Sequence, residues 1–249
     1  MTDEAHEDYA PYEHVDEDWQ TALAVVAHPD DMEYGGAAAV ARWTAQGKKV
    51  VYVMVTSGEA GIDGIAPAEC GPLREAEQIA SARVVGVDTV EFLGHRDGVV
   101  EYGLPLRRDI ARAVRRHRPD IVITSNFRET YGGVFLNQAD HIAVGRATLD
   151  AVRDAGNRWV FPELLEEGHE PWNGTRQIWA AASPESGHAV DTTETFDLGV
   201  ASLEEHRAYL AGLAGQMAEP REFLEGFGRG AGTRLGTRFA VPFEVFPLR

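Results

Sequence analysis

Cysteine is nearly absent from this sequence, and long apolar runs are missing as well. Cys70 is the only cysteine among 249 residues, so no intramolecular disulfide can form. This fits a reducing compartment. No apolar stretch approaches the roughly 20 residues that a membrane-spanning helix needs. The first 20 residues contain neither Lys nor Arg, unlike a signal peptide. We therefore expect a cytoplasmic protein.

Positive charge is also scarce. The net charge is −17, so we expect neither nucleic acid nor an anionic membrane as a partner, because both select basic surfaces. Residues 1–20 hold eight acidic residues, which is about half of the excess. We predict that this segment is an acidic tail and that residues 21–249 form a single domain. The acidity itself indicates solubility and says little about function.

Short apolar runs alternate with segments of helical composition along the predicted domain. This alternation predicts an α/β fold with a doubly wound, mostly parallel, Rossmann-like sheet in three αβα layers. Right-handed crossovers give the strand order 3-2-1-4-5, which places the first and fourth strands side by side at the switch point where ligands bind. The predicted strands are residues 22–27, 49–58, 89–94, 120–126 and 176–182. The predicted helices include 33–46, 71–86, 105–119, 139–156 and 197–216, and the Gly-rich segment 226–236 is expected to be a loop.

An imidazole and several carboxylates follow the first predicted strand. His28 and Asp31 are three residues apart in a turn, so both can point at one centre and bind Zn²⁺. We expect a third ligand from the fourth strand or just beyond it, where His141 opens the next helix. Three protein ligands leave one position for water, as in catalytic zinc sites. Asp30, beside the ligand pair, is placed to be a general base.

The same residues have structural alternatives. "HPDD" is also compatible with a plain strand-to-helix turn in which an Asp caps the helix. Short motifs match often by chance, so the metal interpretation relies on the position of the motif at the predicted switch point. A dinucleotide site is disfavoured, because acids at this turn repel pyrophosphate and G-x-G-x-x-G is absent.

The stretch "AHPDDMEYGGA" at residues 27–37 resembles the signature of the PIG-L/LmbE-like zinc deacetylases. That family includes N-acetylglucosaminyl-phosphatidylinositol deacetylases and the deacetylases of mycothiol and bacillithiol synthesis. The resemblance implies an LmbE-like fold, Zn²⁺ as cofactor, and hydrolysis of the amide of a small N-acyl amino-sugar-like substrate. Further stretches follow in the order of the family: "VTSGEAG", "LREAEQIASARVVGV", "FLGHRDG", "DIVITSN", "ADHIAVG" and "DTTETFD".

The resemblance implies the same zinc ligands, His28, Asp31 and His141, and the same general base, Asp30. It also implies three substrate-binding residues. Arg74 matches an arginine that binds the substrate, while Asp97 and Glu59 match residues near the sugar pocket. Structural alternatives remain for all three. Arg74 is also compatible with an exposed helix position, Asp97 with a surface turn and Glu59 with a loop cap.

One motif departs from the pattern of the family. The H-x-D-H motif reads Gln138-Ala139-Asp140-His141 here, so the His that polarises the substrate carbonyl in the family is missing. Gln138 can still donate an N–H to an oxyanion but cannot titrate, and the role of Asp140 beside it becomes open. His95 is a candidate for the missing acid, with packing as the alternative. The sequence thus allows an active hydrolase, or a degenerate member that binds a sugar-like ligand or cleaves another amide.

Overall fold

The structure, a computed structural model, describes residues 10–248. Within that range the main sheet has eight strands, and five of them run in the order β4-β3-β2-β5-β8. Neighbouring strands among these five are parallel. The predicted strand order and the doubly wound Rossmann-like fold are therefore confirmed. The five strands are β2 (Thr21–Val26), β3 (Lys49–Met54), β4 (Thr89–Phe92), β5 (Ile121–Ser125) and β8 (Gln177–Ala181).

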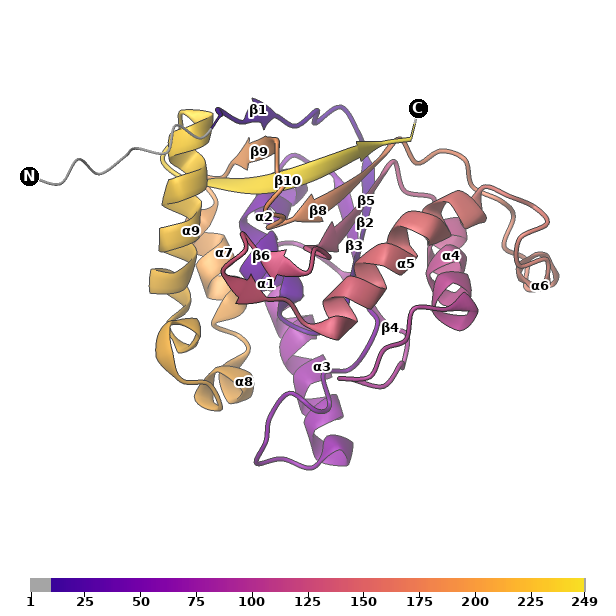
Figure 1. The fold of residues 1–249 in the computed structure, drawn as a ribbon, viewed down its shortest axis with the longest axis horizontal. Helices are drawn as coiled ribbons and strands as arrows, with labels where there is room; N and C mark the ends of the chain where they lie inside the picture. Colours follow the sequence, from indigo (N-terminus) through magenta and orange to yellow (C-terminus); the bar gives the residue numbers. More distant parts are fainter. Residues whose placement is uncertain (1–9, 249) are drawn as a thin grey trace, which may run out of the picture.

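Helices cover both faces of the sheet and complete the three layers (Figure 1). Leu23 and Val25 of β2 pack with α4 and α5 on one face, while Ala22 and Ala24 pack with α2 and α3 on the other. Successive residues of β2 point to opposite faces of the sheet, and helices cover both faces. β2 is therefore apolar along its length. No helix in the described range is long and apolar enough to cross a membrane. The helices are α1 (Asp31–Gly35), α2 (Ala37–Ala45), α3 (Pro67–Val84), α4 (Leu104–His117), α5 (Ala139–Ala155), α6 (Glu163–Glu166), α7 (Phe196–Leu203), α8 (Arg207–Ala211), η1 (Gly215–Ala218) and α9 (Pro220–Leu235).

Three strands that the sequence analysis did not predict extend the sheet beyond β8. β10 (Ala240–Pro247) lies antiparallel between β8 and β9 (His188–Asp191), and β1 (Glu13–His14) pairs with β9. β1 belongs to the predicted acidic tail, and Trp19 is buried edge-on against two further tryptophans. Part of the predicted tail therefore contacts the sheet, while the boundary at residue 20 stays a prediction. Residues 1–9 of the predicted tail lie outside the described range.

The helical segments also differ from the predictions. The segment predicted as a helix at 33–46 divides at Gly36, whose φ is −158°. The segment predicted as one helix at 197–216 divides into α7 and α8, followed by the 3₁₀ turn η1. Of residues 226–236, predicted as a loop, residues 226–235 belong to α9 and Gly236 is its C-cap. The glycines of this helix allow the backbone to pack closely. A Cβ on Gly232, for example, would lie only 2.7 Å from the carbonyl oxygen of Arg238.

The switch point of the sheet lies between β2 and β5, which are neighbours. After β2 the chain enters α1 and α2 and returns through β3 on one side. After β5 it passes through a small hairpin into α5, on the opposite face (Figure 1). The hairpin strands are β6 (Thr130–Tyr131) and β7 (Phe135–Leu136). The segments that leave the carboxyl ends of β2 and β5 therefore flank the position at which ligands bind in such sheets.

Candidate metal centre

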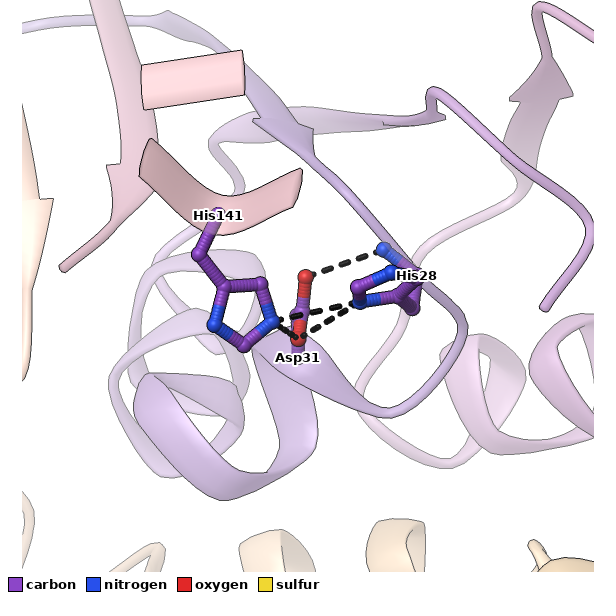
Figure 2. A group of neighbouring side chains, drawn as sticks. All are labelled: His28, Asp31 and His141. Carbon is purple, nitrogen blue, oxygen red and sulfur yellow. Dashed lines mark hydrogen bonds and ion pairs between the residues drawn. The ribbon is translucent and has the colours of Figure 1, made fainter. Parts of the chain in front are cut away.

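Three side chains converge at the switch point. His28 and Asp31 come from the turn after β2, His141 lies in the first turn of α5, and Figure 2 shows the three pointing toward one another. His28 Nδ1 lies 3.2 Å from His141 Nε2 and 3.8 Å from Asp31 Oδ1. His141 Nε2 lies 3.0 Å from the same Asp31 oxygen. The structure thus brings together the three residues that the sequence predicts as metal ligands.

The spacing of these atoms suits a tetrahedral zinc ion. Bonds of about 2.0–2.2 Å separate the ligand atoms of a tetrahedral ion by about 3.3–3.6 Å. The three observed separations, 3.0, 3.2 and 3.8 Å, lie on both sides of that range. The second oxygen of Asp31 accepts the backbone N–H groups of Ala27 and His28, each at 2.9 Å, which directs the first oxygen toward the centre. Two nitrogens and one carboxylate oxygen leave a fourth position open.

Acceptors on the outer side of each imidazole hold its outer N–H and turn its inner nitrogen toward the centre. His28 Nε2 faces the carboxylates of Asp97 at 3.1 Å and Asp140 at 3.3 Å, so its N–H donates outward. His141 Nδ1 lies 2.9 Å from Asn137 Oδ1, an acceptor, and donates in the same way. In their neutral forms, the two imidazoles therefore direct the lone pairs of their inner nitrogens to one point, together with the nearby ligand carboxylate. Lone pairs this close are stabilised by a cation between them, and this set of donor atoms fits Zn²⁺.

The charge balance of the site agrees with a cation position. Burial alone would raise the pKa of Asp31, but His141 and His28 together outweigh burial and hold that pKa far below its usual range. Burial alone would lower the pKa of His28, but hydrogen bonds to Asp140 and Asp31 carry it well above its ordinary value. A proton and a metal ion therefore compete for the same place.

Asp30, the predicted general base, adjoins the ligands in an uncommon backbone conformation. Its φ of 84° and ψ of −19° lie in the left-handed region, which residues other than glycine seldom adopt. Its N–H donates to Gln78 Oε1 at 2.8 Å, and its Oδ2 accepts from Arg74 Nη2 at 2.7 Å. Burial raises the pKa of Asp30 to about 6, while Arg74 opposes the rise and Asp31 adds to it. A carboxyl group that titrates near neutrality suits proton transfer.

The sequence predicts substrate binding by Arg74, whereas its buried guanidinium contacts the protein itself. It donates to Pro29 O at 2.7 Å, to Gly58 O at 3.2 Å and to the Asp30 carboxylate, and the Tyr209 ring covers it at 4.1 Å. Gly58 makes room for it, because a Cβ there would lie 2.5 Å from Arg74 Nη1. These contacts indicate that Arg74 holds Asp30 in place, and contact with a substrate stays a prediction.

Asp97 and Glu59, predicted near the sugar pocket, lie on the outer side of His28. Asp97 Oδ1 faces His28 Nε2, and Asp97 Oδ2 accepts the N–H of Ala60 at 2.8 Å. The N–H of Asp97 donates to Glu59 Oε1 at 2.8 Å, so these contacts join the loops that follow β3 and β4. Asp97 therefore orients a candidate ligand. Substrate binding by either residue stays a prediction.

The two residues of the departing motif have different surroundings. Gln138 is the exposed N-cap of α5, and its side chain makes no hydrogen bond to any described residue. Asp140 is buried, and its oxygens accept the N–H groups of Gly98 at 2.7 Å and Val100 at 3.0 Å. The same carboxylate faces His28. Asp140 thus supports a candidate ligand and not the side chain at position 138, and a catalytic part for either residue stays a prediction.

Asn137 is a site residue that the sequence analysis did not identify. Its Nδ2 donates to Asn126 O at 2.8 Å and to Arg128 O at 2.9 Å, which fixes its Oδ1 toward His141. The available signal was spacing, because Asn137 precedes His141 by four residues, about one helical turn. Asn137 therefore sets the orientation of the imidazole on α5.

Two further groups near the switch point have defined partners. The Tyr131 hydroxyl of the hairpin lies 3.4 Å from His141 Nδ1, and burial raises the pKa of Tyr131, so the hydroxyl keeps its proton at neutral pH. His95 Nε2 lies 3.0 Å from Asp109 Oδ2 on α4. This contact supports the packing interpretation of His95.

Known proteins share this fold. A diacetylchitobiose deacetylase of Thermococcus kodakarensis is 25% identical over 232 residues, covering 92% of this chain and 84% of that protein. A 1D-myo-inositol 2-acetamido-2-deoxy-alpha-D-glucopyranoside deacetylase of Saccharopolyspora erythraea is 30% identical over 183 residues, covering 63% of this chain and 64% of that protein. The structure of the N,N'-diacetylchitobiose deacetylase from Pyrococcus horikoshii matches with a TM-score of 0.84 at 24% identity, covering 92% of this chain and 85% of that one.

The fold and the converging side chains define a doubly wound α/β protein with a candidate metal centre at its switch point. Residues 23–152, just over half of the chain, match the family PIG-L, described as GlcNAc-PI de-N-acetylase. The chain belongs to this family. The three candidate ligands, His28, Asp31 and His141, all lie within the matched residues.

Proposed function

We propose that this chain is a zinc-dependent hydrolase that removes an acetyl group, or another short acyl group, from the nitrogen of an N-acyl amino sugar. The observation that carries the proposal is the convergence of His28, Asp31 and His141 directly beside the buried Asp30. Relatives that are named as deacetylases of acetylated amino sugars support the substrate class. The net charge of −17 supports a small-molecule substrate over a nucleic acid or an anionic membrane.

The proposed mechanism assigns each residue a separate task. His28, Asp31 and His141 would hold the ion, which would lower the pKa of a water molecule toward about 7 and polarise the substrate carbonyl. Asp30 Oδ2 is held by Arg74, and no described residue hydrogen-bonds to Asp30 Oδ1. We infer that Oδ1 accepts a proton from the water that attacks the amide carbon.

Breakdown of the tetrahedral intermediate needs a donor for the oxyanion and a proton for the leaving nitrogen. The side-chain N–H of Gln138 is the proposed donor to the oxyanion. Gln138 carries no titratable proton, so Asp30 returns to the amine nitrogen the proton that it took from water. Water and the amide are thereby converted into a carboxylic acid and a free amine.

A second function stays open because Gln138 replaces the imidazole of the family motif. In that case the chain binds a sugar-like ligand without turnover, or hydrolyses a different amide. The surroundings of Asp30 favour the hydrolase. A protein that only binds a ligand has no need of a carboxyl group whose pKa burial raises to about 6 beside a metal centre.

Amine release from N-acetylglucosamine and N,N'-diacetylchitobiose, measured with and without added zinc, tests the proposal. We expect Asp30→Asn to lower kcat by about 10²- to 10⁴-fold, as for loss of a general base. We expect His141→Ala to lose bound zinc. Asp150→Asn is the matched control, because it removes an acid from α5 that contacts the Tyr102 hydroxyl and not the site. Zinc-independent activity, or full activity in Asp30→Asn, would contradict the mechanism.

A further inference from the structure

Helix α3 reaches Asp30 with two side chains that lie one helical turn apart. Arg74 and Gln78 are four residues apart, so they share one face of the helix. Arg74 Nη2 donates to the Asp30 carboxylate at 2.7 Å, and Gln78 Oε1 accepts the Asp30 N–H at 2.8 Å. The carboxylate and the backbone of Asp30 are therefore held from the same direction.

The backbone of Asp30 requires such support. Its φ of 84° is in the left-handed region, where a residue with a Cβ persists only when its surroundings favour that conformation. Gln78 is fully buried and Asp30 is 5% exposed, so water is poorly placed to replace the hydrogen bond to the Asp30 N–H. The bond from Gln78 thus stabilises the conformation that directs the Asp30 side chain.

Glu33 determines which way the Gln78 amide faces. Gln78 Nε2 donates to Glu33 Oε1 at 2.9 Å, and the same oxygen accepts the Ser81 hydroxyl at 2.7 Å. A flipped amide would place an NH₂ group against the Asp30 N–H and an oxygen against the Glu33 carboxylate. Glu33 therefore keeps the acceptor end of Gln78 toward Asp30.

We propose that Gln78 is a positioning residue for Asp30 and that Glu33 positions Gln78. This inference rests on the proposed function, in which Asp30 is the general base. The inference means that catalysis requires support of the Asp30 backbone in addition to the metal ligands. An intact metal centre is insufficient for catalysis unless a buried carboxylate–amide pair holds the backbone of the base.

The first test compares Gln78→Met with wild type as the zinc-loaded full chain. Met keeps the length of the side chain and removes both hydrogen bonds. We expect kcat for amine release to fall by about 10- to 100-fold, as for small displacements of a catalytic group, with KM and zinc affinity unchanged. We also expect faster hydrogen exchange at the Asp30 amide, measured by NMR. Thr148→Val removes a buried hydroxyl of α5 that bonds to Val144 O, and serves as the control with unchanged kcat.

The second test exchanges the two polar groups. Gln78→Glu alone places two carboxylates 2.9 Å apart, which we expect to be as damaging as Gln78→Met. In the double variant Glu33→Gln/Gln78→Glu, the new Glu accepts the Asp30 N–H and an N–H of the new Gln. We therefore expect the double variant to regain at least about 10-fold in kcat over Gln78→Glu, because the two sites couple.

The outcomes separate this inference from the proposed function. A kcat for Gln78→Met equal to that of the Thr148→Val control would overturn the positioning role, as would a double variant no better than Gln78→Glu. If Gln78→Met does not fold, the comparison of the single and double Glu variants decides. An inactive wild type would refute the proposed hydrolase instead, while unchanged Asp30 amide exchange in Gln78→Met would still refute the contact with Gln78.

Discussion

Removing one of the two carboxylates behind His28 should weaken zinc binding, and Asp140→Asn is the sharpest way to do so. Asp140 Oδ2 accepts from Gly98 N–H and faces His28 Nε2, while Oδ1 accepts from Val100 N–H. An Asn offers one oxygen and one NH₂ group. In one orientation the NH₂ group faces Val100 N–H, and in the other it faces Gly98 N–H and His28. Either way, at least one donor loses its acceptor.

The size of the effect follows from these contacts. A hydrogen bond to a charged group contributes about 1.5–3 kcal/mol. Asp97 still accepts from His28 Nε2 at 3.1 Å, so the loss is partial. Replacing an outer partner of a ligating histidine typically lowers metal affinity by about 10- to 100-fold, which is about 1.4–2.7 kcal/mol. We expect Asp140→Asn to fall within that range.

The assay is a competition titration of zinc between the metal-free protein and a chromophoric chelator. Asp150→Asn, on the same helix, has the same change of charge without contact to the ligands, so it corrects for the general effect of charge. Asp97→Asn should weaken zinc binding to a similar degree. Wild-type dissociation constants for both Asp97→Asn and Asp140→Asn would refute the orientation of His28 by these carboxylates, and with it the assignment of Nδ1 as the ligand atom.

Three further predictions concern the metal and the stability of the fold. Chelation should abolish activity, and zinc at 100 times its dissociation constant should restore it and add about 2.7 kcal/mol to the free energy of unfolding, measured in urea. Gly58→Ala should cost about 1–3 kcal/mol by the same measurement, because φ is +63° and the new Cβ would meet Arg74. Burial alone would raise the pKa of Glu17, but Arg42 and Trp43 lower it below 4.5. Its stabilisation is therefore present above pH 4.5 and lost below it, so acid unfolding curves of Glu17→Gln and wild type should converge as the pH falls.

The parallel half of the sheet could be predicted because its signal is local. Each of its five strands, β2, β3, β4, β5 and β8, is a short, largely apolar run beside a helix, and the right-handed crossover rule then leaves few possible strand orders. β1, β9 and β10 carry weaker signals. β10 includes Pro242 and Glu244 and pairs with β8, which lies about 60 residues earlier in the chain. Tertiary contacts determine which strand β10 pairs with, and the residue pattern of β10 alone does not predict that partner.

The convergence of the three candidate ligands could be predicted, whereas most of their supporting residues could not. His28 and Asp31 are close in sequence, and a resemblance to a known motif covers His141 as well. The partners of these candidate ligands come from distant segments, since Asp97, in the loop after β4, and Asp140, in the first turn of α5, meet at His28 only after folding. Gln78 is an example of the same limit, because nothing in its surrounding helix distinguishes it from an ordinary polar position.

The structure also explains how position 138 can change without loss of the metal centre. In the motif of this chain, Asp140 bonds to His28 and to the loop at Gly98, and Asn137 orients His141. None of these three contacts involves the side chain of Gln138, which is exposed at the start of α5. The ligands therefore depend on buried partners, while the proposed oxyanion donor does not belong to that network. On the proposed mechanism, a substitution at position 138 should therefore change the stabilisation of the oxyanion and leave the ligand geometry intact, so retention of the ligands alone does not determine the rate.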